Sequence, residues 1–127
     1  MTQRGSEVTE REGAGPAEPS EGPGAMVVLV TVPDAETGAQ IGRTLVAERL
    51  AACVNLVPGL RSIYRWEGEI QDDAEVLLLV KTRADRLPEL SSRVEALHPY
   101  ELPEVLALAA AGGSPAYLDW VCSEASP

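Results

Sequence analysis

Three residues of the chain are of types that bind soft metal ions: Cys53, Cys122 and the single histidine, His98. Thiolate ligands, with imidazole as a borderline partner, favour Cu(I) or Zn(II) over Mg²⁺ or Ca²⁺. A closed structural zinc site takes four ligands, so one chain does not supply a zinc finger. A metal site would have to be shared between subunits or completed by water or by carboxylates such as Glu101. The alternative for His98 is a structural role at a helix end, next to the last carbonyls.

Nucleophilic catalysis would need Cys53 or a serine beside His98 and an orienting acid such as Glu101 or Glu104. The chain contains no G-x-S-x-G, P-loop or G-x-G-x-x-G motif, so acyl transfer, phosphoryl transfer and dinucleotide chemistry lack support. Cys53 lies in the apolar stretch LAACVNLV, where a thiol is usually an unreactive core residue. We therefore predict that the protein is not an enzyme and that both cysteines are reduced.

Lys81 is the one lysine beside nine arginines, and it follows an apolar run. Two interpretations stay open. In the first, Lys81 neutralises a buried carboxylate such as Glu75, or an anion held between subunits. In the second, the aliphatic part of its side chain lies on apolar surface while the ammonium stays in water. Tyr64 and Trp66 alternate along a segment with strand character. They could form a binding platform, although alternating aromatic residues more often pack.

The composition places these residues in one globular domain, since 127 residues with 45% hydrophobic and 24% charged positions leave room for one core. The formal net charge of −10 repels phosphate backbones and anionic membrane surfaces. No apolar run approaches the roughly 20 residues that span a bilayer, and the N-terminus lacks the pattern of a signal peptide. We expect a soluble, unexported protein that binds neither nucleic acid nor membrane.

Residues 1–25 differ from the rest of the chain in composition. They contain five glycines, three prolines and five glutamates, with no aromatic residue. Such a segment cannot offset its ordering entropy by burial, so we predict a disordered acidic leader over 1–25. The folded domain is then expected over 26–127.

Hydrophobic periodicity predicts the elements of that domain. An apolar strand over 26–32 precedes a helix capped by Asp34, whose buried side should carry Ile41, Leu45, Val46 and Leu50. A strand over 53–66, bent at Pro58-Gly59, turns at Glu67-Gly68 into a strand over 70–82. A helix over about 85–97, a strand over 105–110 and a helix from Ser114-Pro115, with Tyr117, Trp120 and Val121 inward, complete the order.

This order predicts an α+β fold of the ferredoxin-like βαββαβ type with an additional C-terminal helix. Helices on one face of a four-stranded sheet leave the other face bare, and the long hairpin projects beyond a compact domain. Both the bare face and the hairpin need to be covered, and contact with another subunit is the simplest way to cover them.

Three segments, RLAACVNLVPGLRSIYRWEGEIQDDAEVLLLVKT, ALHPYELPEVLAL and YLDW, together resemble the CutA family of divalent-cation tolerance proteins. The resemblance runs from about Met26 to Cys122. It implies a cytoplasmic homotrimer of ferredoxin-like subunits, similar in architecture to the PII signalling proteins, with hairpin strands that join sheets across subunits. It also implies a role in the response to divalent metal ions, with copper binding attributed to some members.

The family motifs map onto eight positions of this chain. The resemblance implies that Cys53 and His98 are metal ligands and that a cleft between subunits is lined by Tyr64, Trp66, Lys81, Tyr100, Glu101 and Glu104. Some relatives carry a further thiol on the first strand, where this chain has Val30, which reduces the supply of soft ligands. We therefore expect a non-enzymatic homotrimer that binds Cu or Zn weakly through His98 and Cys53. The alternative is a PII-like regulatory or scaffolding trimer that holds a small anion or a partner protein in its intersubunit clefts.

Overall fold

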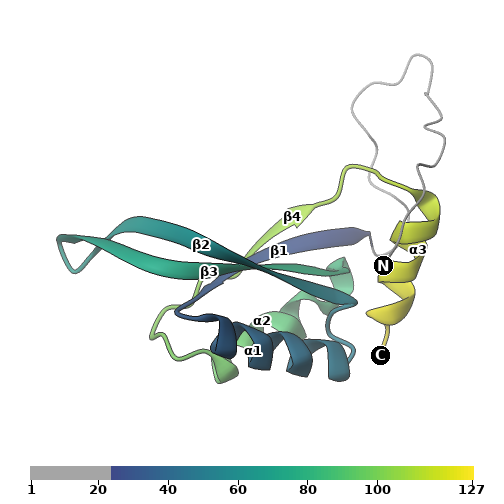
Figure 1. The fold of residues 1–127 in the computed structure, drawn as a ribbon. Helices are drawn as coiled ribbons and strands as arrows, with labels where there is room; N and C mark the ends of the chain where they lie inside the picture. The colour runs from purple at the N-terminus through teal and green to yellow at the C-terminus, as the bar shows by residue number, and fades with distance from the viewer. Residues whose placement is uncertain (1–23) are drawn as a thin grey trace, which may run out of the picture.

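The computed structural model describes residues 24–127 as one sheet with three α-helices (Figure 1). The predicted leader lies outside these residues, except for Gly24 and Ala25. The elements are β1 (Ala25–Val32), α1 (Ala35–Ala47), β2 (Cys53–Trp66), β3 (Glu69–Arg83), the short 3-10 turn η1 (Ala84–Arg86), α2 (Leu87–Leu97), β4 (Leu106–Ala109) and α3 (Pro115–Glu124). This order confirms the predicted ferredoxin-like fold with an additional helix. No helix among the described residues is long and apolar enough to cross a membrane.

The sheet has the strand order β2-β3-β1-β4, and every neighbouring pair is antiparallel. β1 is therefore a central strand, which explains its unbroken apolar sequence. Val28, Val30 and Val32 are fully buried, and they alternate with residues that are only half-buried. Across the sheet, Val28 lies opposite Val80 and Val30 lies opposite Leu78, so one face of the sheet carries the core.

Helices α1 and α2 both cover that face of the sheet (Figure 1). Asp34 caps α1, because its carboxylate accepts a hydrogen bond from the Thr37 N–H at 2.7 Å, which also lowers the pKa of Asp34. Ile41 and Leu45 of α1 are buried as predicted. The prediction for Val46 is wrong: its side chain is 42% exposed, because it lies one position around the helix from Leu45.

The opposite face of the sheet is apolar and largely uncovered. In register, Leu29 lies between Leu79 on β3 and Leu106 on β4, and Leu106 is 53% exposed. The β2-β3 hairpin extends past the other strands and ends at Glu67 and Gly68, both with positive φ (Figure 1). The predicted bend at Pro58-Gly59 is present as a bulge within one strand, since the β2-β3 register shifts between Val57 and Leu60.

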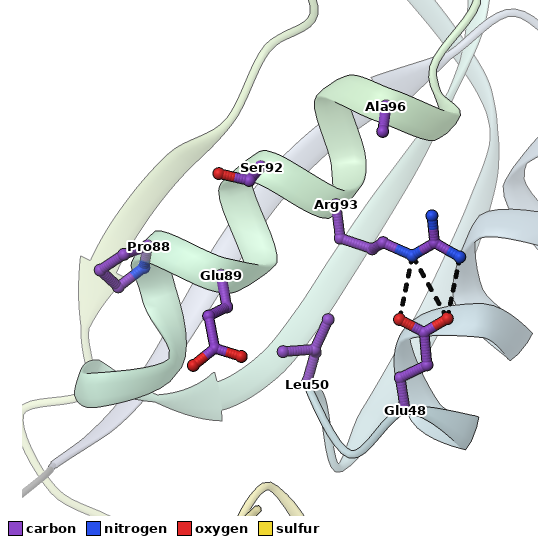
Figure 2. A pocket seen from close by; sticks show the side chains of 7 residues that line it. All are labelled: Glu48, Leu50, Pro88, Glu89, Ser92, Arg93 and Ala96. Atoms are coloured by element: carbon purple, nitrogen blue, oxygen red, sulfur yellow. Dashed lines mark hydrogen bonds and ion pairs between the residues drawn. The ribbon is translucent and has the colours of Figure 1, made fainter.

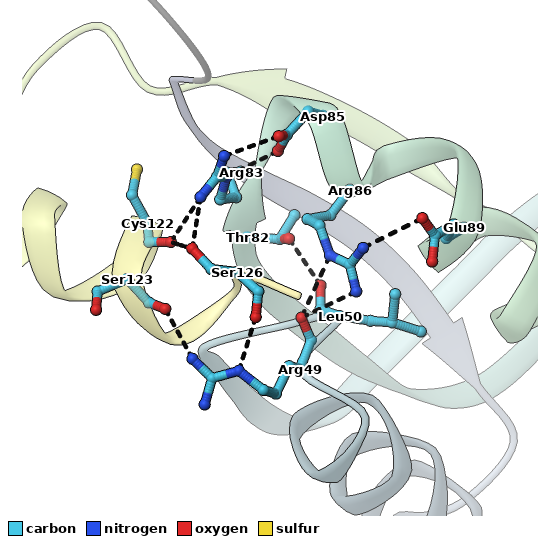
Figure 3. A network of polar contacts seen from close by, with 10 residues as sticks. All are labelled: Arg49, Leu50, Thr82, Arg83, Asp85, Arg86, Glu89, Cys122, Ser123 and Ser126. Carbon is cyan, nitrogen blue, oxygen red and sulfur yellow. Dashed lines mark hydrogen bonds and ion pairs between the residues drawn. The ribbon is translucent and has the colours of Figure 1, made fainter.

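Helix α3 packs at the end of β1 and β3 rather than in the helix layer, and a group of arginines binds its C-terminal end (Figure 3). Arg49 donates to the carbonyl oxygens of Ser126 and Ser123 at 2.7 and 2.9 Å. Arg83 donates to the carbonyl oxygen of Cys122 at 3.2 Å and to Ser126. These guanidiniums satisfy carbonyls that a helix end leaves without partners.

The burial of side chains on α3 and the length of β4 agree only in part with the sequence prediction. Val121 is fully buried, as predicted, whereas Tyr117 and Trp120 are half-buried and lie against each other with ring centroids 5.7 Å apart. The predicted strand over 105–110 is shorter, because only Leu106–Ala109 pair with β1.

Close packing of α1 on the sheet generates a stability prediction at Gly38. A Cβ atom there would lie 3.0 Å from Leu78 Cδ2 and 3.1 Å from Val32 Cγ2, both in the filled core. We expect Gly38→Val to lower the free energy of unfolding by about 2 kcal/mol or more, measured by urea denaturation. The matched control is Gly112→Val, where nothing lies within 4 Å of the added Cβ. An equal loss in both variants would contradict the packing argument.

Candidate functional site

The predicted site residues on β2 and β3 form a first group at the uncovered face, around Lys81. Cys53 and Lys81 are partners in the β2-β3 register, and the Lys81 ammonium donates a hydrogen bond to the side-chain oxygen of Asn55. The Cys53 thiol lies 3.9 Å from the same oxygen. Lys81 forms no ion pair with any described residue.

Glu75 is buried, as predicted, with 7% of its surface exposed. The hypothesis that Lys81 neutralises it is wrong, because six strand positions separate the two residues, which is roughly 20 Å of extended chain.

A second group consists of acidic residues and tyrosines near the base of the hairpin. The Tyr100 hydroxyl donates to Glu75 Oε2 at 2.7 Å, and the Tyr64 hydroxyl donates to Asp73 Oδ2 at 2.5 Å. Glu104 belongs to the same group, because burial and then the charge of Glu75 raise the pKa of Glu104. We call Asp73, Glu75 and Glu104, with these two tyrosines, the acidic cluster.

The acidic cluster contains negatively charged groups and no cation that pairs with them among the described residues. Burial, followed by the hydrogen bond to Glu75, raises the pKa of Tyr100, and the hydrogen bond to Asp73 raises the pKa of Tyr64. Among residues 24–127, none of the three carboxylates forms an ion pair with a cation. The cluster therefore concentrates negative charge that a single chain does not neutralise.

Trp66 and Glu101 are not brought into the acidic cluster by contacts in the described structure. Trp66 pairs with Glu69 next to the hairpin turn and is 37% exposed. Glu101 is exposed in the loop between α2 and β4. The cleft predicted from the sequence is therefore not assembled within one described chain, and the prediction of a cleft between subunits stays a prediction.

His98 is buried and both of its ring nitrogens lie within hydrogen-bond distance of the backbone. Nε2 lies 2.7 Å from the Thr31 carbonyl oxygen, and Nδ1 accepts a hydrogen bond from the Tyr100 N–H at 3.1 Å. A carbonyl only accepts, so Nε2 is the donor in its contact with Thr31, and Nδ1 is the acceptor in its contact with Tyr100. The ring also lies 4.6 Å from the Tyr100 ring.

These contacts bear on the Cu or Zn site implied by the family resemblance. A ligating imidazole needs a free nitrogen lone pair, and the lone pair of Nδ1 in His98 already accepts a hydrogen bond. The described residues contain no group of three or more His, Cys, Asp or Glu side chains arranged to hold a metal ion. The donors of one chain thus do not fit such a centre, and metal binding through His98 and Cys53 stays a prediction.

Sequence reasoning missed Asn55 and Asp73. The Asp73 contact had a signal, because a two-residue turn at Glu67-Gly68 sets the register that places Asp73 one diagonal step from Tyr64. The signal for Asn55 was weaker. Asn55 lies two residues after Cys53, on the same face of β2, and Cys53 is the register partner of Lys81. Neither residue type in isolation indicates a site.

A shallow hollow of about 480 Å³ lies elsewhere, between the end of α1 and the outer side of α2 (Figure 2). It is crossed by an ion pair in which the Arg93 guanidinium binds both oxygens of Glu48 at 2.9 to 3.2 Å. Its lining includes Leu50, Pro88 and Ser92 and none of the site residues predicted from the sequence.

Comparisons with known proteins agree with this fold. The family model of the CutA1 divalent ion tolerance protein matches residues 26–124. The divalent-cation tolerance protein CutA of Thermus thermophilus is 59% identical over 95 residues, which cover 75% of this chain and 92% of that protein. A chloroplastic CutA protein of Arabidopsis thaliana is 50% identical over 97 residues, and the match spans about half of its length, 53%.

Solved structures show the same similarity. The structure of the divalent cation tolerance protein (Cut A1) of Thermus thermophilus superposes with a TM-score of 0.77 at 56% identity, covering 79% of this chain and 97% of that one. The names of the family and of these relatives state no enzymatic activity. Since the family model covers almost all of the described residues, the chain belongs to the CutA1 family of divalent ion tolerance proteins.

Proposed function

We propose that this chain assembles as a cytoplasmic homotrimer that takes part in the response to divalent metal ions and catalyses no reaction. The observation that carries the proposal is the uncovered apolar face of the sheet in a chain of this family. Leu106 and Leu108 on β4 are 53% and 50% exposed, and Val57 on β2 is 41% exposed. Contiguous exposed apolar surface of this kind marks an interaction site.

The edges of the sheet support assembly between identical chains. β2 and β4 are the outer strands in the order β2-β3-β1-β4, so each leaves one side without a strand partner among the described residues. Unpaired strand edges invite pairing with another chain. Contacts between two different edges of identical chains are heterologous, and such contacts form a ring when the rotation between successive copies closes. A ring of three also places the hairpin of each chain against a neighbour.

The absence of catalysis is part of the proposal, and the geometry around the candidate nucleophile supports it. Cys53 lies beside Asn55 and Lys81, whereas His98 contacts Thr31 and Tyr100. A thiol without a neighbouring base does not form the nucleophile and base pair of a covalent mechanism.

The metal response, as we propose it, does not depend on a metal centre within one chain. His98 would have to give up a backbone hydrogen bond before either nitrogen could bind Cu or Zn. A negatively charged assembly still attracts divalent cations over its surface, because the described residues carry fifteen carboxylates and eight cationic side chains.

A second candidate function is a regulatory or scaffolding trimer, similar to the PII proteins, that binds a small anion between subunits. Lys81 favours this candidate, since it is the one lysine and it hydrogen-bonds a neutral amide rather than a carboxylate. Its ammonium at an uncovered face is available to an anion that the neighbouring chain helps to enclose.

The oligomeric state is the first prediction. Sedimentation equilibrium at micromolar concentration should give three times the chain mass of 13.5 kDa. The variant Leu106→Glu places a charge in the uncovered face and should shift the protein towards monomer, because burying an unpaired carboxylate is costly. Glu95→Gln on the exposed side of α2 is the control and should stay trimeric. A 13.5 kDa species for the wild type would contradict the trimer.

Direct metal binding is tested by calorimetry with Cu(I), Cu(II) and Zn(II). Because both ring nitrogens of His98 already have backbone hydrogen-bond partners, we expect His98→Ala and Cys53→Ala to give the same binding heat as the wild type. Circular dichroism checks that His98→Ala is folded, since this side chain is buried. Heat that disappears in either variant would establish the site predicted from the sequence and contradict our geometric argument.

The second candidate function predicts a ligand that depends on Lys81. In a thermal-shift screen of small anions, at least one should raise the melting temperature of the wild type and have no effect on Lys81→Ala. Arg43→Ala, which removes an exposed cation elsewhere, is the matched control. If every hit stabilises Lys81→Ala as much as the wild type, the anion proposal fails.

A further inference from the structure

We propose that helix α3 is a releasable cover over the residues around Lys81, and that Arg49 is the latch that holds this cover closed. The residues covered are Cys53, Asn55 and Lys81, which we call the Lys81 group. The inference deepens the second candidate function, on which it rests, because it states how an anion gains access to Lys81. A neighbouring chain would enclose the Lys81 group from the uncovered face, so the side under α3 is the remaining entrance.

The position of α3 on the sheet is the first observation. Val80 and Thr82 of β3 are fully buried. Successive residues of a strand point to opposite faces, so Lys81 and Arg83 belong to the face that α1 and α2 leave uncovered. The Arg83 guanidinium donates to the carbonyl oxygen of Cys122 on α3 at 3.2 Å. Helix α3 therefore lies at the end of β3, on the same face as Lys81 (Figure 3).

The other end of α3 lies beside Cys53. Burial, and then the negative charge of a Cys53 thiolate, raise the pKa of Tyr117, which follows the first turn of α3. Cys53 is in turn the register partner of Lys81. The spacing agrees with this placement, because Tyr117 precedes Cys122 by about 7.5 Å of helix. Lys81 precedes Arg83 by about 6.6 Å of strand, so α3 runs along the strand with Tyr117 near the Lys81 group.

Few apolar contacts attach α3 to the rest of the chain. Of residues 115–125, Val121 and Ala125 are buried, whereas α1 buries four residues. The segment before α3, residues 111–113, is exposed and belongs to no helix or strand. A Cβ atom at Gly112 would meet nothing within 4 Å, so this segment is not packed. An element with little buried apolar surface after such a linker opens more readily than the core.

Arg49, in the turn after α1, supplies the polar contacts that hold the end of α3. Its guanidinium donates to the carbonyl oxygens of Ser126 and Ser123, at 2.7 and 2.9 Å, and lies 3.7 Å from the Glu124 carboxylate (Figure 3). Hydrogen bonds from a charged donor are stronger than those between neutral groups. Loss of this side chain would weaken the attachment of α3 and leave the core beneath α1 and α2 intact.

The backbone of Arg49 indicates that its side chain matters. Arg49 has a φ of 59°, in the left-handed region that an ordinary side chain disfavours. Glycine is the usual residue at such a position just after a helix, because it has no Cβ. An arginine there is strained, and strained positions persist where the surrounding structure uses them. The contacts of Arg49 with the end of α3 are that use.

The thiol of Cys53 reports whether the cover is open. The full-length wild type and Arg49→Gly are alkylated with iodoacetamide, and peptide mass spectrometry follows Cys53 separately from Cys122. Arg49→Gly relieves the backbone strain and removes the latch. We expect alkylation of Cys53 to become about tenfold faster or more, because at least two charge-assisted hydrogen bonds are lost. Deuterium uptake of α3 should rise in the same variant, while uptake of β1 stays unchanged.

Glu67→Gly is the matched control. Glu67 also has a positive φ, 51°, but it lies at the hairpin turn. This substitution relieves the same kind of strain without touching the latch, so the alkylation rate of Cys53 should not change. Arg49→Asn, which tolerates the same backbone but is too short to reach α3, should behave like Arg49→Gly. Circular dichroism checks that the variants are folded, and Arg49→Asn replaces Arg49→Gly if the latter is not.

Iodoacetate separates the cover from the anion site, because it is an anionic reagent with the same reactive carbon. The ratio of the iodoacetate rate to the iodoacetamide rate at Cys53 should fall about threefold or more in Lys81→Ala. Arg49→Gly should raise both rates alike. If Arg49→Gly changes neither Cys53 alkylation nor α3 exchange, or if Glu67→Gly changes them equally, the cover is overturned. A ratio indifferent to Lys81→Ala instead overturns the anion site on which the inference rests.

Discussion

The structure depends on one constraint, the packing of both long helices on the same face of a four-stranded sheet. Val28, Val30 and Val80 fill that face beneath α1 and α2. Because side chains alternate along a strand, the strands that supply this core also present Leu29 and Leu79 on the opposite face. The uncovered apolar face is thus a consequence of the core and not a separate feature.

His98 connects this core to the charged part of the molecule. Its buried imidazole lies within hydrogen-bond distance of the Thr31 carbonyl on β1 and accepts from the Tyr100 N–H, so it fixes the loop that follows α2 to the central strand. That loop in turn places the Tyr100 hydroxyl on the buried carboxylate of Glu75. A buried carboxylate needs such a donor, since an unsatisfied charge in the interior is costly. The histidine therefore positions the acidic cluster through hydrogen bonds, without needing to bind metal.

Periodicity and turn chemistry in the sequence were sufficient for the fold. The apolar run over 26–32, the cap at Asp34 and the turn at Glu67-Gly68 are local signals, and each element that they predict is present. The failures at the candidate site and at the end of α3 involve contacts between distant segments. Residue types near Lys81 did not show that its partner is Asn55 rather than Glu75, and no pattern indicated that Arg49 binds the end of α3. Such contacts depend on three-dimensional distances that spacing in the sequence does not encode.

In the trimer that we propose, the same residues would serve both assembly and the candidate site. Loss of function in a variant at Glu104 or Tyr64 would not by itself identify a ligand, because both residues also belong to the cleft that is predicted between subunits. The two effects separate by their dependence on protein concentration. A ligand contact is lost equally at all concentrations, whereas a weakened interface is recovered as concentration rises, by mass action. Any assignment of a ligand to the cluster therefore requires the oligomeric state to be measured in the same solution.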